Sequence, residues 1–137
     1  MVMKKCCGVH ALRIAVRMIV LGLLLAGSAN AANLTVCPGG CEYSSIQKAI
    51  KSSSNGDTIL VKSGTYFEKV KINKKLTLRG IGNPVVDAGE SGSAITLAAK
   101  GIRLEGFTAT GSDHSPESGI EVFSSNNTLS RNIATMF

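Results

Sequence analysis

Apolar residues recur along this chain at a nearly constant spacing. Three columns repeat with steps of 25 or 26 residues: Val70, Ile95 and Ile120; Ile72, Leu97 and Val122; and Leu78, Leu104 and Leu129. A fixed period of this length is typical of a solenoid, in which each repeat buries its apolar edge against the neighbouring repeats. The pattern therefore predicts three stacked copies of one structural unit.

Within one repeat, apolar and polar residues alternate with a period of two, which predicts strands over 58–61, 64–66, 70–72 and 76–78. The turns between them are too short for the helix that crosses between parallel strands of an open sheet. A hairpin meander also uses short turns, but it gives no reason for the 25-residue recurrence. We therefore predict coils of three short parallel strands, with the apolar columns pointing inward. The outward positions include Lys71, Thr77, Thr96, Arg103 and Glu121.

A short amphipathic helix precedes the first coil. The run from Ser44 to Gln47 has the pattern of a capping box, with Ser44 as the cap and Gln47 reaching back to it. Ile46, Ala49 and Ile50 form one apolar stripe, and the helix ends before Asn55. We expect this helix to cover the open end of the stacked strands.

The first 31 residues have the pattern of a signal peptide. Basic residues precede a short apolar run over Met18–Ala26, and Ala29 and Ala31 supply the small residues of a cleavage site. An uncleaved membrane anchor is the alternative, but the apolar run is much shorter than the ~20 residues of a spanning helix. The predicted organisation is a signal peptide over 1–31, an N-terminal segment over 32–56 and β-helix coils over 57–137. The product is expected to be secreted, extracellular, at the cell surface or periplasmic, without a stable membrane span.

Removal of the signal peptide leaves a nearly neutral chain. Four of the 15 Lys and Arg residues leave and all nine Asp and Glu residues stay, so the net charge is 11 minus 9, about +2. Aromatic residues are scarce and Trp is absent, which argues against nucleic acid as a partner. Lys69, Lys71, Lys74 and Lys75 are interpreted as a solvated strand face, with a phosphate or polyanion site as the alternative.

Only Cys37 and Cys41 remain after processing. Pro and two Gly lie between them and favour a tight turn, so a disulfide is predicted. A metal site needs further ligands, and His114 is the only remaining histidine. We therefore expect no metal and no cofactor.

These residues resemble the opening of right-handed parallel β-helix proteins of the pectin-lyase-like superfamily, over Cys37 to Phe137. The resemblance rests on these residues: Ser45-Ile46-Gln47, Ala49-Ile50, Gly56-Asp57-Thr58-Ile59, Val61, Gly64-Thr65-Tyr66, Glu68, Val70, Ile72, Leu76-Thr77-Leu78 and Gly80. The later residues Gly119-Ile120-Glu121-Val122, Ser124-Ser125-Asn126-Asn127 and Asn132 resemble the repeats of NosD-type periplasmic copper-associated proteins, also described as carbohydrate-binding and sugar-hydrolysis repeats.

The superfamily resemblance implies possible enzymes that cleave, epimerise or de-esterify acidic polysaccharides, but no catalytic residue of the family can be carried over. Asp113 and His114, in the polar run over 112–118, are the only catalytic candidates, with His114 as a general base. A plain solvated loop is the alternative. Asp87 occupies a predicted turn and could share a calcium ion with Asp113. The copper ligands on offer are His114 and Met136.

Asn126, Asn127 and Asn132 are predicted to have structural roles, either in turns with positive φ or in ladders of stacked Asn side chains. Glycan attachment at Asn126 or Asn33 is the alternative.

The mature chain of 137 minus 31, or 106, residues is long enough for the helical cap and about three coils. No cap is evident after Leu129 and Ile133, which predicts a truncated member, one piece of a longer protein, or an edge that pairs with another chain. The sequence favours an exported non-catalytic β-helix module that binds polysaccharide or a cell-surface glycan, or has a structural role there. The alternatives are a truncated polysaccharide lyase or epimerase and an accessory protein of periplasmic copper delivery.

Overall fold

The computed structural model describes residues 30–112 and 118–136. From Ala31 onward the described residues form one compact unit. The predicted signal peptide lies outside these ranges except for its last two residues, so its cleavage stays a prediction.

The described chain contains one helix and twelve strands, most of them three to five residues long. In chain order they are β1 (Asn33–Val36), α2 (Ile46–Ser52), β2 (Thr58–Lys62), β3 (Thr65–Phe67), β4 (Val70–Ile72), β5 (Thr77–Ile81), β6 (Val85–Asp87), β7 (Ile95–Leu97), β8 (Arg103–Glu105), β9 (Thr108–Ser112), β10 (Ile120–Val122), β11 (Thr128–Ser130) and β12 (Ile133–Met136).

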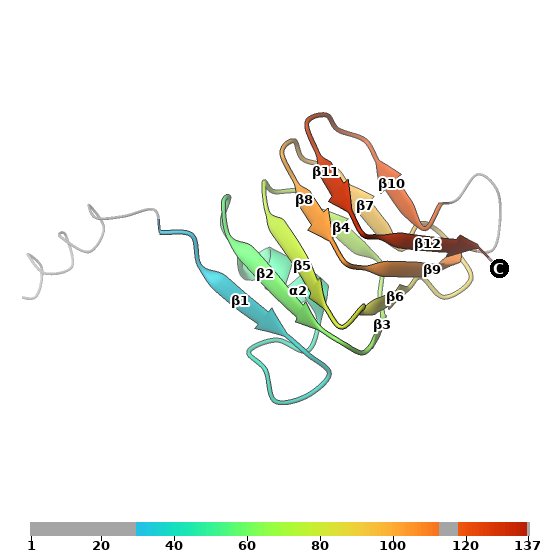
Figure 1. Cartoon of the computed structure of the whole chain (residues 1–137), viewed down its shortest axis with the longest axis horizontal. Coiled ribbons are helices and arrows are strands. Elements are labelled where there is room, and N and C mark those ends of the chain that lie inside the picture. The colour runs from blue at the N-terminus through green and yellow to red at the C-terminus, as the bar shows by residue number, and fades with distance from the viewer. Residues whose placement is uncertain (1–29, 113–117, 137) are drawn as a thin grey trace, which may run out of the picture. The chain divides into compact units, whose positions relative to one another are not determined.

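These strands form three parallel sheets that wind into a β-helix, as Figure 1 shows. The sheets have the orders β1-β2-β5-β8-β11, β4-β7-β10 and β3-β6-β9-β12. Each complete coil contributes one strand to each sheet, and the complete coils are β2-β3-β4, β5-β6-β7 and β8-β9-β10. β1 precedes these three coils and β11 with β12 follows them. The predicted fold, a parallel β-helix with a short helix near its start, is confirmed.

The apolar columns predicted from the 25-residue spacing are aligned in the sheets. Val70 lies beside Ile95 and Ile95 beside Ile120, while Leu78 lies beside Leu104 and Leu104 beside Leu129. The members from the complete coils up to β8 are buried in the bore. The predicted outward residues alternate with them and are exposed or half-buried. The alternation of the strand thus places every second side chain in the core.

Strands β1, β6, β9 and β12 are not predicted by the sequence pattern. β1 pairs over four residues with β2 in the N-terminal segment, where the pattern indicates only a loop and a helix. Asp87 is the last residue of β6 rather than a turn residue, although its Oδ1 accepts a hydrogen bond from the Gly89 N–H at 2.9 Å. These strands contain few large apolar residues, which explains why periodicity does not reveal them.

Helix α2 packs its apolar stripe of Ile46, Ala49 and Ile50 on β1, β2 and β4. The prediction that Ser44 caps it is wrong, because Ser45 is the N-cap and accepts from Lys48 N–H at 3.3 Å. The remaining first-turn donors are satisfied by Glu68, whose carboxylate accepts from Ile46 N–H at 2.8 Å and Gln47 N–H at 3.1 Å. A carboxylate from the adjacent coil has taken the place of the local capping box.

Gln47 pairs with the exposed edge of β4 instead of reaching back along the helix. Its Oε1 accepts from Lys71 N–H at 2.8 Å, and its Nε2 donates to Lys71 O at 3.3 Å. The side-chain amide thereby occupies donor and acceptor positions that a further strand would occupy. The helix therefore covers this end of the solenoid, as the sequence predicts.

The four lysines between 69 and 75 do not form a single solvated face. The Lys74 ammonium donates to the carbonyls of Ile50, Lys51 and Ser53 at 2.9, 3.0 and 2.6 Å, where it closes the C-terminal end of α2. Lys69 Nζ donates to Ser91 Oγ at 3.1 Å. Lys74 is therefore a structural residue, and the predicted cluster is divided between different tasks.

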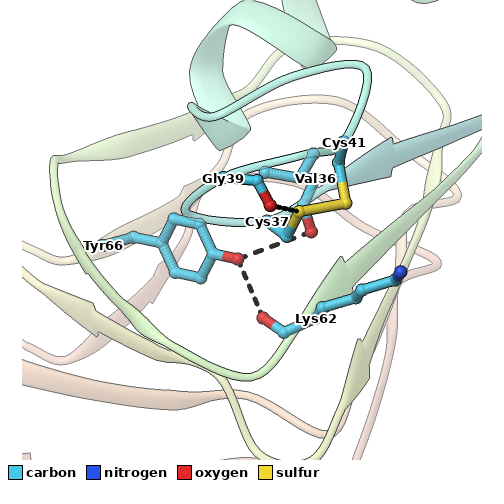
Figure 2. Close-up of a disulfide and its surroundings, with 6 residues drawn as sticks. All are labelled: Val36, Cys37, Gly39, Cys41, Lys62 and Tyr66. Atoms are coloured by element: carbon cyan, nitrogen blue, oxygen red, sulfur yellow. Dashed lines mark hydrogen bonds between the residues drawn. A yellow bond between two sulfur atoms is a disulfide. The ribbon is translucent and has the colours of Figure 1, made fainter.

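A disulfide joins Cys37 and Cys41, the pair predicted from the sequence, with their Cα atoms 5.5 Å apart. Beside it, the buried Tyr66 hydroxyl lies 2.8 Å from Lys62 O and 3.4 Å from Val36 O, as Figure 2 shows. Burial, and to a smaller extent the charge of Glu68, raise the pKa of Tyr66 above its ordinary value of 10.0. The phenol is therefore a neutral donor that ties the disulfide loop to the first coil.

The asparagine ladder is wrong, whereas the turn role is confirmed for Asn126, which has a φ of 60°. Asn127 Oδ1 accepts from Ile102 N–H at 2.9 Å, and Asn132 Oδ1 accepts from Phe107 N–H at 3.0 Å. Each amide thus bonds the backbone of the preceding coil, because the stacked position there holds an apolar residue and not a second asparagine.

Candidate functional site

The principal pocket among the described residues lies on the outer face of the five-stranded sheet. It has a volume of about 490 Å³ and lies at the C-terminal ends of β5 and β8. Its lining residues are Leu60, Arg79, Gly80, Ile81, Asn83, Glu105, Gly106 and Arg131. Four successive passes of the chain supply this set, so the pocket depends on the stacking of coils.

Two stacked glycines leave room for the pocket. A Cβ at Gly80 would overlap the carbonyl of Gly106, the corresponding residue one coil further on. Gly106 also has a φ of 76°, which L side chains rarely adopt. Side chains are therefore excluded from the floor, and the surrounding polar groups form the rim.

Glu105 lies between two arginines at this site. It forms an ion pair with Arg131, and its other oxygen lies 4.0 Å from Arg79 Nε. The side chain of Glu105 is 16% exposed, whereas those of Arg79 and Arg131 are 58% and 73% exposed. The three groups carry a net charge of +1, with the guanidinium groups on the solvent side.

This arrangement is suited to binding an anionic, hydroxyl-rich ligand. Guanidinium groups bind carboxylates through paired hydrogen bonds, and the exposed Asn83 amide offers both a donor and an acceptor. Leu60 and Ile81 add apolar surface at the rim. Glycoside hydrolysis by the usual two-carboxylate mechanism needs a pair of acids, and the lining contains one. The pocket therefore has the chemistry of a binding site.

A smaller pocket of about 330 Å³ lies near the disulfide loop. Phe67, which is 79% exposed, borders it together with Pro38, Ser44, Thr65 and other residues. The carboxylate in this pocket belongs to Glu68, whose oxygens already accept hydrogen bonds from the start of α2. Its charged group is thus committed to the fold.

The catalytic candidates Asp113 and His114 lie outside the described residues. Asp87 is described, but its proposed calcium partner Asp113 is not. Within residues 30–112 and 118–136, no group of three His, Cys, Asp or Glu side chains could hold a metal ion. Cys37 and Cys41 are joined to each other, which removes two potential copper ligands.

The pocket residues are not singled out by the sequence pattern, although a signal for them exists. Arg79 and Glu105 each follow a leucine of the third apolar column by one residue, so alternation places both outward in adjacent coils. Arg131 is harder to find, because it follows β11 with a φ of 53°. Backbone direction at that corner cannot be inferred from a period of two.

Comparison with known proteins agrees with the fold. A pectin methylesterase solved in complex with a hexasaccharide matches with a TM-score of 0.51 and 24% identity, over 64% of this chain and 33% of that one. This likeness establishes the shared β-helix architecture. No family model matches the chain, so the NosD-type branch stays a prediction.

A curated relative comes from Methanothermus fervidus and is named a cell surface glycoprotein. It is 36% identical over 90 residues, which make up 64% of this chain and 15% of that protein. The chain therefore spans a small part of the relative's length. In the part of the chain that the structure describes, no helix has the length and hydropathy to cross a membrane.

Proposed function

We propose that this protein is an exported, non-catalytic β-helix module of the cell surface that binds acidic carbohydrate. The observation that carries the proposal is the pocket on the five-stranded sheet, where Arg79 and Arg131 flank a single carboxylate. Its supports are the β-helix fold, which a carbohydrate-active enzyme shares, and the cell-surface name of the curated relative. The disulfide is consistent with an oxidising compartment.

Uronate polymers are the proposed ligand class. Each uronate unit has one carboxylate for a guanidinium group and several hydroxyls for the amide of Asn83. The ion pair with Glu105 orients Arg131 and leaves its exposed side free for the ligand. Because the guanidinium groups are well exposed, we expect modest affinity that weakens as salt is added.

Binding can be tested by calorimetry with uronate oligosaccharides and with neutral oligosaccharides of equal length. Arg79→Ala and Arg131→Ala should each weaken uronate binding by roughly tenfold. Arg103→Ala is the matched control, because Arg103 is an exposed arginine of β8 that does not line the pocket. Equal loss in all three variants, or equal affinity for neutral sugars, would contradict the proposal.

The same incubations distinguish a binding module from the enzyme alternative. A lyase releases unsaturated uronate products that absorb in the ultraviolet, and an esterase releases an alcohol and acid. We expect neither product. Product formation that disappears in Asp113→Asn or His114→Gln would instead favour the truncated-enzyme hypothesis.

A further inference from the structure

The two ends of the solenoid differ in how their backbone edges are covered. At the N-terminal end, Tyr43 exchanges backbone hydrogen bonds with Thr35 and Cys37 beside β1, and the Gln47 amide occupies the edge of β4. At the other end, β10, β11 and β12 are the outermost strands of their sheets (Figure 1). Among the described residues, their hydrogen bonds to other coils run to the preceding coil.

The same end exposes the apolar columns of the core. Val122, Leu129 and Ile133 are 45%, 42% and 53% exposed. Their stacked partners Leu97 and Leu104 in the preceding coil are fully buried. Val122 and Leu129 occupy the same inward positions, and they are exposed because no described residue covers the last coil. The result is an apolar surface bordered by three strand edges.

Backbone direction shows which groups face the open end. Thr128 N–H donates to Ile102 O and Ser130 O accepts from Gly106 N–H, so both residues face the preceding coil. In a parallel strand, alternate residues bond opposite neighbours. The N–H and C=O of Leu129, between them, therefore point to the open end.

Charge does not protect this end. The charged residues among 118–136 are Glu121 and Arg131, which have opposite signs. Glu121 accepts from Ser93 Oγ at 3.0 Å and Arg131 pairs with Glu105, so both are engaged with the preceding coil. Edge strands of soluble proteins are usually blunted by lysine or proline, and these three strands contain neither.

We propose that β10, β11 and β12 form a self-association surface on which the same end of a second copy docks about a two-fold axis. The occupant must offer three short strand edges at the same spacing and an apolar bore of the same outline. The N-terminal end of another copy does not fit, because Tyr43 and Gln47 already cover its edges. The C-terminal end fits, and each column then meets its own copy.

The symmetry is compatible with strand pairing. A two-fold axis perpendicular to the solenoid reverses the winding direction of the second copy, so facing strands run antiparallel. Antiparallel strands form short, well-aligned hydrogen bonds. The interface is isologous and closes at two copies, because each copy has one open end.

The test is sedimentation velocity of the exported full chain over a wide range of concentration. We expect a dimer that dissociates on dilution, and Leu129→Lys should weaken dimerisation by roughly tenfold or more. Phe67→Lys is the control, because Phe67 is also apolar and is 79% exposed but lies near the covered end. A monomer at every concentration, polymers that grow without limit, or equal loss in the control would overturn the proposal.

Hydrogen exchange of the unmutated protein provides a second readout that does not depend on how a variant folds. The amides of Val122 and Leu129 should exchange more slowly at high than at low protein concentration. Exchange of Leu97 and Leu104 amides, inside the stack, should not depend on concentration. Concentration-independent exchange at Leu129 would overturn the proposal.

Discussion

Asp57 connects three segments at the start of the solenoid. Its Oδ1 accepts from Ala32 N–H at 2.9 Å, and its Oδ2 accepts from Ser54 N–H at 2.7 Å. The bonds from Ser54 and Ala32, with a smaller contribution from the charge of Lys74, lower the pKa of Asp57 below its ordinary value of 3.8. The ionised carboxylate is thus stabilised by folding.

This lowered pKa predicts a specific acid sensitivity. The stabilisation is complete above the unfolded pKa, near ~4, and is lost as pH falls through the folded pKa. Asp57→Asn removes the ionisation, so the variant should be less stable at neutral pH, and the difference from the unmutated protein should narrow below about pH 4. Urea unfolding at a series of pH values measures the difference. A constant difference across the acid range would contradict this assignment.

At the scale of single side chains, residue type predicts the kind of role better than the partner. Asn126, Asn127 and Asn132 are expected at turns, and their backbone or amides do serve the chain there. The partners Ile102 and Phe107 lie 25 residues earlier and are identifiable only when the coils are stacked. The same holds for Lys74, whose sequence neighbours give no indication of the helix carbonyls it binds.

Among the elements, α2 depends on a carboxylate from outside the helix. Glu68→Ala would leave the Ile46 and Gln47 amides without their acceptor, and we expect a loss of about 1–2 kcal/mol in the free energy of unfolding. Glu121→Ala is the control, because Glu121 is half-buried but bonds a single serine hydroxyl. Chemical denaturation compares the two. Equal losses would show that the helix cap adds nothing beyond an ordinary surface contact.

The third apolar column allows identical substitutions in different surroundings. Leu78 is 1% exposed and Leu129 is 42% exposed, although both occupy the same position in the coil. Leu78→Ala should cost about 3 kcal/mol, whereas Leu129→Ala should cost less than about 1.5 kcal/mol in dilute solution. Denaturant unfolding at low protein concentration makes the comparison. An equal cost at both positions would mean that the last coil is covered even in the monomer.

For the whole molecule, the disulfide stabilises the covered end of the solenoid. Cys37 and Cys41 are four residues apart and close a small loop. Replacing both by Ser should cost about 2 kcal/mol, the amount expected for so short a loop. Thermal unfolding of the variant and of the reduced native protein should agree. A much larger loss, or agreement only after prolonged reduction, would show that the loop has additional contacts that serine disrupts.

The pocket and the open end are both properties of the whole stack. Arg79, Glu105 and Arg131 come from successive coils, so no local segment contains the site. Similarly, the exposure of Leu129 depends on its position in the last described coil and not on the residue type. The candidate loop around Asp113 is prominent in the sequence because its polar residues are consecutive.

The sequence by itself determined the parallel β-helix, the register of its three columns and the covering helix. Parallel stacking repeats each side-chain position once per coil, so the core is recorded as a constant spacing that can be counted. Only the tertiary structure decided that Glu68 caps α2, that two arginines flank Glu105, and how each end of the stack is covered. These contacts join residues more than 20 positions apart at corners, where backbone direction rather than apolar periodicity determines the side-chain partner.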